Sequence, residues 1–568
     1  MLLDGFTPYA GVQEKGLNWW TNERFAIGWK GHLYLPGLQA GTASVAELAE
    51  RLTARPLPQV AAELAGVFGL FVHDQMRGGW QASSDNAGLY RIFHDERGLG
   101  TSFLELLADR GRDSSAIRPR AILEYLSYGA WFGPDSPADG VRRLAYDEVL
   151  VLTPGQPPQL VRKDVLAPPN DGTEHVLGHF DDLAQSLKHA SASVDATAGY
   201  DSRVIVSLLA QRGVDFEAAV SGYPGTDDVE IGRRIAETLR RPFFASHHDE
   251  STLEADLPAL FEAGDGLTDL RRFHRDYQNA RRRLERGVEV IVHGNGGELF
   301  KDQYAYQDFP FYGRSRANLE KYYSLRVVPI SVPASYLTRS AQPMLADIRP
   351  RALALMKKLV RPTNNETYNS LWYFLRSGDH VGQFYSNYIN AGLNVAAPYL
   401  DFRTAHVGMR LPPWQTVFTR WHRSVITRAC PEIAGIPTSD GYTASSDWGY
   451  LPRNIAGYAF TQLRRAAKKA SQKILGKAMF HRAGAFAADA PGFVARLRTS
   501  GHFAQAVRRL QAADILSPDL QPSAVRDIHV GRIMTMGMLL THLDRAKPDV
   551  VEPRRKASAP NLDLHPAR

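Results

Sequence analysis

The chain is nearly free of cysteine. Its 568 residues include a single cysteine, Cys430, which excludes an internal disulfide and a cluster of thiolate metal ligands. The 18 histidines show no metal-ligand spacing such as H-E-x-x-H, so a bound transition metal is not expected. No apolar run approaches the ~20 residues of a membrane-spanning helix, and residues 1–5 lack the features of a secretion signal. These absences predict a soluble cytoplasmic protein with no integral membrane segment.

A strong charge of one sign is also absent. The net charge of +7 is modest for this length; it suits an anionic ligand but does not require nucleic acid, so no nucleic-acid partner is predicted. With 44% hydrophobic and 22% charged residues, the chain can bury sizeable cores. A chain of this length is expected to fold as two or three domains.

The sequence pattern changes along the chain. Residues 1–170 contain short β-like runs broken by Gly, Asn and Asp, such as Val67–Val72. After a Pro- and Gly-containing linker at 167–172, strands alternate with helical segments, as in Glu217–Ser221 followed by Asp228–Leu239. Such alternation predicts a parallel sheet covered by helices.

The later part of the chain is mainly helical from about Pro343, and its last residues, from Lys547, are rich in proline and charge. The predicted fold class is therefore α/β. We expect a β-rich domain at 1–170, an α/β domain with a helical C-terminal extension at 171–545, and a disordered tail at 546–568.

A turn of small and polar residues precedes an apolar helix near position 200. It consists of Thr197, Ala198, Gly199, Tyr200, Asp201, Ser202 and Arg203. Backbone N–H groups at the start of a helix suit a phosphate, and a glycine lets the backbone approach it closely. The Asp201 carboxylate can hold Mg²⁺, and the hydroxyls of Thr197 and Ser202 can donate hydrogen bonds. The turn predicts a nucleotide-phosphate site, with an ordinary capped helix as the alternative.

A second glycine-rich turn follows an apolar strand at 288–292. It spans His293–Phe300 and carries Gly294, Asn295 and Glu298. Ligands of open α/β sheets bind at the carboxyl ends of the strands, which is where this turn is expected to lie. Alone it is equally typical of a tight structural turn.

Together with further segments, these turns resemble the asparagine synthetase family. The first resembles the family's Ser-Gly-Gly-x-Asp-Ser pyrophosphate loop, and the second resembles its Gly-Glu-Gly-x-Asp-Glu-x-Phe segment. Val220-Ser221-Gly222 resembles the strand and loop beside the adenine and ribose, and 397–403 resembles the Pro-Phe-Leu-Asp element. Residues 64–74, 84–90, 141–144 and 153–155 resemble parts of the glutaminase domain. The similar segments occur in the family's order over roughly residues 60–450.

The resemblance implies an Ntn-hydrolase-like layered α+β domain followed by an adenine-nucleotide α-hydrolase-like (PP-loop) α/β domain. It implies an ATP-dependent carbon–nitrogen ligase that uses ATP and Mg²⁺ to form an acyl adenylate and release pyrophosphate. Asp201 and Glu298 would bind the metal, and Glu298, Arg203 and Asn295 would act in catalysis. The nucleotide would contact Thr197, Ala198, Gly199, Tyr200, Asp201, Ser202, Val220, Ser221, Gly222 and Gly294.

The chain departs from the family's glutaminase pattern. That activity needs a cysteine at position 2, where this chain has Leu2, and no cysteine occurs in residues 1–429. Cys430 lies in an apolar helical stretch and is expected to belong to the core. The N-terminal domain is therefore expected to be a scaffold, or to bind something else, and no glutamine hydrolysis is predicted.

The synthetase segment departs as well. Asn295 replaces a Glu of the second turn, and no Lys occurs near 438–442, where the family commonly has one. Arg203 is the predicted substitute for the missing positive charge, and Lys301 is another.

Four functions remain open. The chain could join a small-molecule or peptide carboxylate to ammonia or to an amine on a second substrate. It could instead close an amide within one substrate, as in β-lactam or lasso-peptide formation. An ammonia-dependent asparagine synthetase and a non-catalytic nucleotide-binding homologue complete the set. A homodimer is compatible with each of them.

Two segments of the chain are strongly basic. Arginines at 271–283 form a dense stretch before the second turn, and a basic amphipathic helix carries Arg464, Arg465, Lys468, Lys469, Lys473 and Lys477. A solvated surface is the preferred interpretation of both; an acidic substrate is the alternative for the first, and a membrane surface or an acidic partner for the second.

Overall fold

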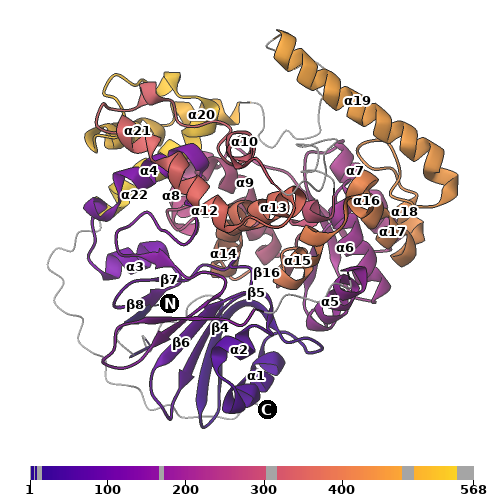
Figure 1. Cartoon of the computed structure of the whole chain (residues 1–568), viewed down its shortest axis with the longest axis horizontal. Coiled ribbons are helices and arrows are strands. Elements are labelled where there is room, and N and C mark those ends of the chain that lie inside the picture. Colours follow the sequence, from indigo (N-terminus) through magenta and orange to yellow (C-terminus); the bar gives the residue numbers. More distant parts are fainter. Residues whose placement is uncertain are drawn as a thin grey trace.

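The computed structural model describes residues 2–4, 7–8, 16–165, 172–301, 316–475 and 492–545 (Figure 1). The predicted tail at 546–568 lies outside these residues, as does almost all of the linker predicted at 167–172, so the boundary at 170 stays a prediction. Within the described residues, none of the helices combines the length and the apolar character needed to span a membrane.

Two antiparallel sheets form the N-terminal part. The larger has the order β11-β10-β6-β5-β4-β3, and the smaller has the order β2-β1-β8-β7-β9. The bounds of the larger sheet are β3 Leu17–Thr21, β4 Phe25–Tyr34, β5 Ala65–Asp74, β6 Trp80–Ser84, β10 Glu148–Leu152 and β11 Gln159–Arg162. The smaller comprises β1 Leu2–Asp4, β2 Thr7–Pro8, β7 Phe93–His94, β8 Gly98–Gly100 and β9 Arg142–Arg143.

The larger sheet is buried on both faces, which explains the nearly continuous apolar sequence of β5. Phe68 and Leu70 point into a core shared with α1 Thr42–Ala54 and α2 Leu57–Ala61. Val67 and Phe71 alternate with them and point into a second core. Successive strand residues face opposite sides of a sheet, so both faces need apolar side chains here. The helices α3 Phe103–Asp109 and α4 Pro119–Tyr128 and the short helix at Ser114–Ala116 complete this part.

A five-stranded parallel sheet forms the centre of the second part, in the order β14-β13-β12-β15-β16. Its strands are β12 Ala192–Asp195, β13 Glu217–Ser221, β14 Phe243–Ser246, β15 Val290–Val292 and β16 Asn394–Ala396. Its connecting helices are α5 Gly172–Ser186, α6 Tyr200–Gln211, α7 Asp227–Thr238, α8 Leu253–Ala263 and α9 Leu270–Glu285. The chain proceeds from β12 to β13 and β14, then crosses to β15 on the other side. The strand order therefore reverses between β12 and β15, and open α/β sheets bind ligands at such a switch point.

The predicted parallel sheet is confirmed, but its last strand was not foreseen. β16 lies within the segment expected to be helical, and it packs near β4 and β5 of the N-terminal sheet (Figure 1).

The helices of this segment are α10 Leu319–Tyr322, α11 Gln342–Ala346, α12 Ile348–Lys358, α13 Asn364–Leu371, α14 Gly382–Asn390, α15 Phe402–Arg410, α16 Pro413–Thr416, α17 Arg420–Ala429, α18 Pro431–Ala434, α19 Leu451–Leu475, α20 Phe493–Thr499, α21 Gly501–Ala512 and α22 Asp527–Arg545. Two π-helices, Tyr323–Val327 and Trp372–Val381, interrupt the series.

One hydrophobic core extends through both parts of the molecule. It includes Phe71 and Leu123 of the N-terminal part and Val292 and Ile389 of the second part. Polar contacts cross the same boundary: the Tyr90 hydroxyl donates to Asn390 Oδ1 over 2.8 Å, and the Arg91 N–H donates to Ser386 Oγ over 2.9 Å. The two parts are therefore joined by a shared apolar interior as well as by buried polar contacts.

Candidate active site at the switch point of the parallel sheet

The first turn, which follows β12, is held in shape by its own hydroxyls. Thr197 Oγ1 and Ser202 Oγ lie 2.8 Å apart, and Ser202 Oγ accepts a hydrogen bond from the Thr197 N–H over 3.1 Å. The Ala198 N–H donates to Asp228 Oδ1 of α7 over 3.0 Å. Gly199, which precedes the first residue of α6, has no side chain to cap the helix, and no side-chain hydrogen bond caps this end. The amides of the first turn of α6 therefore form a preformed site that fits a phosphate.

The second turn packs directly against the first. A Cβ added to Gly297 would lie 2.3 Å from Cγ of Asp201, and one added to Gly294 would lie 3.2 Å from the Ser202 nitrogen. Gly296 has a φ of 102°, and its Cβ would lie 2.7 Å from Leu400 Cδ2. The three glycines let this backbone approach α6 and the segment after β16. The switch point thus brings the two turns, predicted separately, into one place.

Three titratable groups meet where the turns touch. The Lys301 ammonium forms an ion pair with Asp201 Oδ2, and His422 Nε2 of α17 lies 2.8 Å from Asp201 Oδ1. Although burial acts to raise it, Lys301 and His422 lower the pKa of Asp201 to about 2. Burial acts to lower the pKa of Lys301, but Asp201 and Glu298 raise it. Asp201 is therefore an ionised carboxylate and Lys301 an ammonium.

Glu298 is the second carboxylate of the site. Its Oε2 accepts a hydrogen bond from the Gly296 N–H over 3.2 Å. Burial and the nearby Asp201 carboxylate raise the pKa of Glu298. Within the described residues, no group of three or more His, Cys, Asp or Glu side chains is placed to hold a metal ion. Asp201 and Glu298 nevertheless fit Mg²⁺, which usually binds one or two carboxylates together with substrate phosphates and water.

Asn295 is part of a separate polar row along the strand ends. Its Nδ2 donates to the Tyr385 hydroxyl over 2.8 Å, and the Tyr385 ring stacks on His293 with centroids 5.5 Å apart. His293 Nδ1 lies 2.5 Å from Asp195 Oδ2, the last residue of β12. Burial acts to raise the pKa of Asp195, but His293 and Arg283 lower it to about 2. Asn295 therefore has a fixed orientation beside the site.

Arg203 is not part of the charged cluster. Its side chain is fully buried, and Nη1 donates to the carbonyl oxygens of Ile436 over 2.6 Å and Ile433 over 3.3 Å. Nη2 donates to the Pro437 carbonyl over 3.2 Å. Burial lowers the pKa of Arg203 to about 10. These contacts hold the segment after α18 against α6, whereas Lys301 supplies the positive charge beside Asp201.

The residues predicted to contact adenine lie at the end of β13. Val220 is buried, and the Gly222 N–H donates to the Ser246 carbonyl of β14 over 2.8 Å. Asn279 of α9 bridges the two strand ends, donating to Ser221 Oγ over 3.0 Å and accepting from Ser246 Oγ over 2.6 Å. The carboxyl edge of the sheet is thus fixed next to the first turn.

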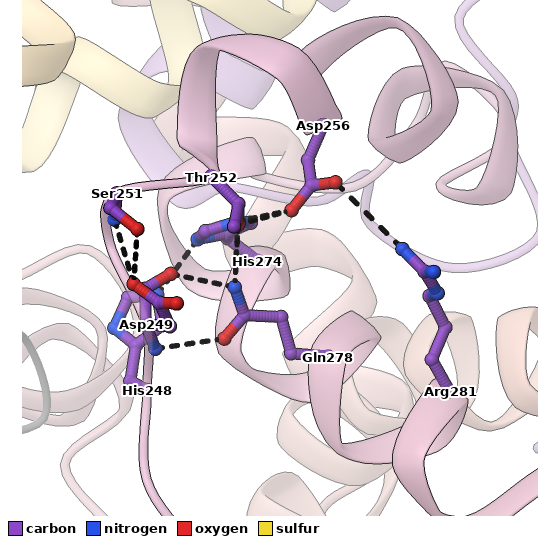
Figure 2. A network of polar contacts seen from close by, with 8 residues as sticks. All are labelled: His248, Asp249, Ser251, Thr252, Asp256, His274, Gln278 and Arg281. Atoms are coloured by element: carbon purple, nitrogen blue, oxygen red, sulfur yellow. Dashed lines mark hydrogen bonds and ion pairs between the residues drawn. The ribbon is translucent and has the colours of Figure 1, made fainter. Parts of the chain in front are cut away.

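A polar network holds the loop after β14 against α9 (Figure 2). His248 Nε2 lies 2.7 Å from His274 Nδ1, and His274 Nε2 lies 3.1 Å from Asp256 Oδ2. Gln278 Nε2 donates to the Asp249 carbonyl over 2.6 Å and to Thr252 Oγ1 over 2.9 Å. The network ties the loop to α9, and no sequence motif indicated it.

Several residues of the site were not predicted, because they belong to none of the sequence motifs. His422 lies in α17, far along the chain from Asp201, and nothing in its local sequence marks it. Tyr399, whose hydroxyl donates to the Asp201 carbonyl over 3.2 Å, lies in a segment noted for its resemblance but had no assigned role. Of the two residues predicted to replace the missing positive charge, Arg203 and Lys301, it is Lys301 that forms an ion pair with Asp201.

The single cysteine lies in the core, as predicted. Cys430 is buried between α17 and α18, and its Sγ donates to Glu432 Oε2 over 3.2 Å. Burial and Glu432 raise the pKa of the thiol to about 12. A thiol that stays protonated at neutral pH is a poor nucleophile.

Comparisons with known proteins give only distant likenesses. No family model matches the chain, and no curated protein matches it. NAD⁺ synthetase from Burkholderia pseudomallei is similar over 36% of this chain and 83% of its own, with 16% identity and a TM-score of 0.18. NMN synthetase from Francisella tularensis is similar over 42% of this chain and 96% of its own, with 15% identity and a TM-score of 0.17. TM-scores this low do not indicate a shared function.

Proposed function

We propose that the chain is an ATP-dependent ligase that activates a substrate carboxylate as an acyl adenylate and passes the acyl group to an amine. The observation that carries the proposal is the meeting of two glycine-containing turns at the switch point, with Asp201, Glu298 and Lys301 around it. Helix amides that no side chain caps, two carboxylates and a half-buried ammonium are the groups needed to hold a triphosphate with its Mg²⁺.

Each group has a proposed role. The amides at 199–202 bind the β- and γ-phosphates, and the Val220–Gly222 backbone borders the adenine. When bound, Mg²⁺ neutralises charge on the phosphates and on the departing pyrophosphate. Lys301 adds a fixed positive charge, held in place by Asp201. Asn295, oriented by Tyr385, is placed to donate to or accept from the substrate.

The reaction has two steps. A carboxylate oxygen of the substrate attacks the α-phosphorus, the bond from that phosphorus to the bridging oxygen breaks, and pyrophosphate leaves. The nitrogen of the amine then attacks the acyl carbon, the bond to the AMP oxygen breaks, and the amine loses a proton. The first step needs no amine, which allows it to be tested alone.

The test is isotope exchange between ATP and labelled pyrophosphate, measured across a panel of carboxylates and extracts of the native host. We expect exchange that depends on a carboxylate and on Mg²⁺, and AMP rather than ADP as the nucleotide product. Lys301→Met is expected to lower exchange a hundredfold or more, the scale for losing one preorganised charge at a transition state. The matched control is Lys188→Met, an exposed lysine outside the site.

Two results would contradict the proposal. ADP as the product would remove the adenylation step. ATP binding without exchange in any extract would favour a non-catalytic nucleotide-binding protein instead. Substrate panels also separate the remaining forms of the reaction, because an intramolecular amide former needs no added amine and an asparagine synthetase needs aspartate and ammonia.

A further inference from the structure

Helix α19 attaches to the protein through its polar side. Asn454 is buried; its Nδ2 donates to the Ser445 carbonyl over 3.1 Å, and its Oδ1 accepts from the Thr443 N–H over 2.8 Å. Thr461, two turns further on, is also buried. Gly457 lies between them, and a Cβ there would lie 2.8 Å from Tyr442 Cδ1. The spacing of these residues places them on one side of the helix, which therefore faces the body of the protein.

The opposite side of α19 is apolar and exposed. Ile455 is 53% exposed, Phe460 66% and Leu463 69%, and Trp448 in the turn before the helix is 85% exposed. Pro452, Ala456 and Ala459 are exposed with them. Figure 1 shows α19 as a long orange helix at the edge of the molecule, away from the N-terminal sheets. This orientation is the reverse of a surface helix that packs on a core, because here the apolar side faces outward.

The charges of the segment have one sign. Residues 448–475 contain six Arg and Lys residues and no Asp or Glu. Five of the six, Arg464, Arg465, Lys468, Lys469 and Lys473, lie in the last three turns of the helix. An apolar side rich in aromatic residues, joined to a cluster of cations, is typical of helices that lie in the plane of an anionic bilayer surface.

We propose that α19 binds the surface of a membrane that contains anionic lipids. Trp448, Ile455, Phe460 and Leu463 enter the boundary between headgroups and acyl chains, and the positive charge of the last helical turns attracts the anionic surface. The sequence pattern alone favoured a solvated helix; the outward direction of the apolar side changes that interpretation. The proposal is independent of the proposed ligase function and is tested without turnover.

The experiment is flotation of the full chain with phosphatidylcholine vesicles, with and without phosphatidylglycerol. We expect binding that requires phosphatidylglycerol and weakens at high salt, because exposed charge pairs are screened. The double variant Phe460→Ser/Leu463→Ser is expected to lower the partition coefficient at least about tenfold, since it removes two inserted side chains. Lys468→Gln/Lys469→Gln is expected to weaken binding to anionic vesicles only.

The matched control is Met76→Ser, which replaces an exposed apolar residue in the turn after β5 and should leave binding unchanged. Far-ultraviolet circular dichroism verifies that each variant is folded. Failure of the native chain to float with anionic vesicles would overturn the proposal. So would a dimer in solution that Phe460→Ser/Leu463→Ser dissociates, because the apolar side would then be an interface between two copies.

Discussion

Lys301 forms an ion pair with Asp201, so the residue directly after the second turn neutralises the acidic residue in the first turn of α6. The contact joins two segments separated by a hundred positions in the chain. It also places one ammonium and one carboxylate next to the helix amides.

Asp201→Asn is expected to remove the Mg²⁺-dependent part of ATP affinity. The substitution keeps the shape of the side chain but removes its charge, and it leaves the half-buried Lys301 without its ion-pair partner. Because both side chains keep some contact with solvent, the expected loss of stability is about 1–3 kcal/mol, below that of a fully buried pair. The affinity for ATP is measured by calorimetric titration, once in the presence of Mg²⁺ and once in the presence of EDTA. Asp215→Asn, at a side chain that is 95% exposed, is the control; equal affinity of Asp201→Asn and the native chain would contradict the assignment.

Gly297→Ala is expected to lower stability by about 1–3 kcal/mol and to weaken ATP binding. The added Cβ would lie 2.3 Å from Cγ of Asp201, so the two turns would have to separate. Urea unfolding and calorimetry provide the two readings. Gly178→Ala is the control, because no atom lies within 4 Å of its added Cβ, and a small gain of about 0.5–1 kcal/mol is expected in helix α5. An alanine at 297 that changes neither quantity would show that the turns do not pack as closely as described.

Arg203→Met is expected to destabilise the protein without a specific effect on chemistry. The substitution removes the side-chain donor of the Ile436 and Pro437 carbonyls, at a cost of about 1–3 kcal/mol for each group that stays buried, whereas the Ile433 carbonyl keeps the Ile436 N–H over 3.2 Å. Exchange of pyrophosphate, divided by the folded fraction, should stay near the native rate. A hundredfold loss of exchange at native stability would instead support the catalytic role predicted from the sequence.

The purified chain is expected to release no glutamate from glutamine, with or without ATP. Its one thiol is buried in the second part of the molecule, and burial with Glu432 raises the pKa of Cys430 to about 12. A coupled glutamate dehydrogenase assay measures release. Glutamate formation would contradict the prediction in either case: loss of the activity in Cys430→Ala would identify the thiol as the nucleophile, and retention would indicate a different route.

Stability is expected to fall as the pH decreases from about 6.5 to 4. Burial lowers the pKa of His32 from 6.5 to about 4, and that of His94, His179, His406 and His529 to about 4 as well, with arginines contributing at several of them. In this window the unfolded chain binds protons that the folded chain does not, so acid favours unfolding. A fully buried member of this group, such as His32, lowers the free energy of unfolding by about 3 kcal/mol by pH 4. The carboxyls of Glu124, Asp265 and Asp379, whose pKa values burial raises to about 7, 6 and 6, offset part of this loss.

The measurement is urea unfolding at several pH values. His32→Gln keeps a polar partner for Ser186 but removes one titrating group, so the slope of stability against pH should become smaller. His247→Gln, at an exposed histidine, should leave the slope unchanged. A stability that does not vary between pH 7 and 5 would contradict this account.

The sequence predicted those parts of the site whose chemistry is visible in a short run of neighbouring residues. Both turns, the parallel sheet and the buried cysteine were predicted because glycines, small polar residues and apolar strands leave a local pattern. Arg203 was assigned to the site because it follows Ser202 in the chain. A helix turns about 100° per residue, however, and every position from Val204 to Leu209 is buried, so this part of α6 has no solvent-facing side. This run, apolar except for Ser207, was the available signal that Arg203 also faces the interior.

The remaining contacts depend on distant parts of the chain. His422 reaches Asp201 from α17, and Tyr385 orients Asn295 from α14. β16 is short and lies among helices, and it is recognisable as a strand only by its pairing with β15. Tertiary packing decides these features, and no local pattern encodes them.

The continuous core makes the N-terminal sheets part of the same folding unit as the second part. Because Phe71 and Leu123 share an interior with Val292 and Ile389, deleting residues 16–165 would expose the inner face of the second part to water. The two parts are therefore expected to stabilise each other, and the chain is expected to melt in one transition.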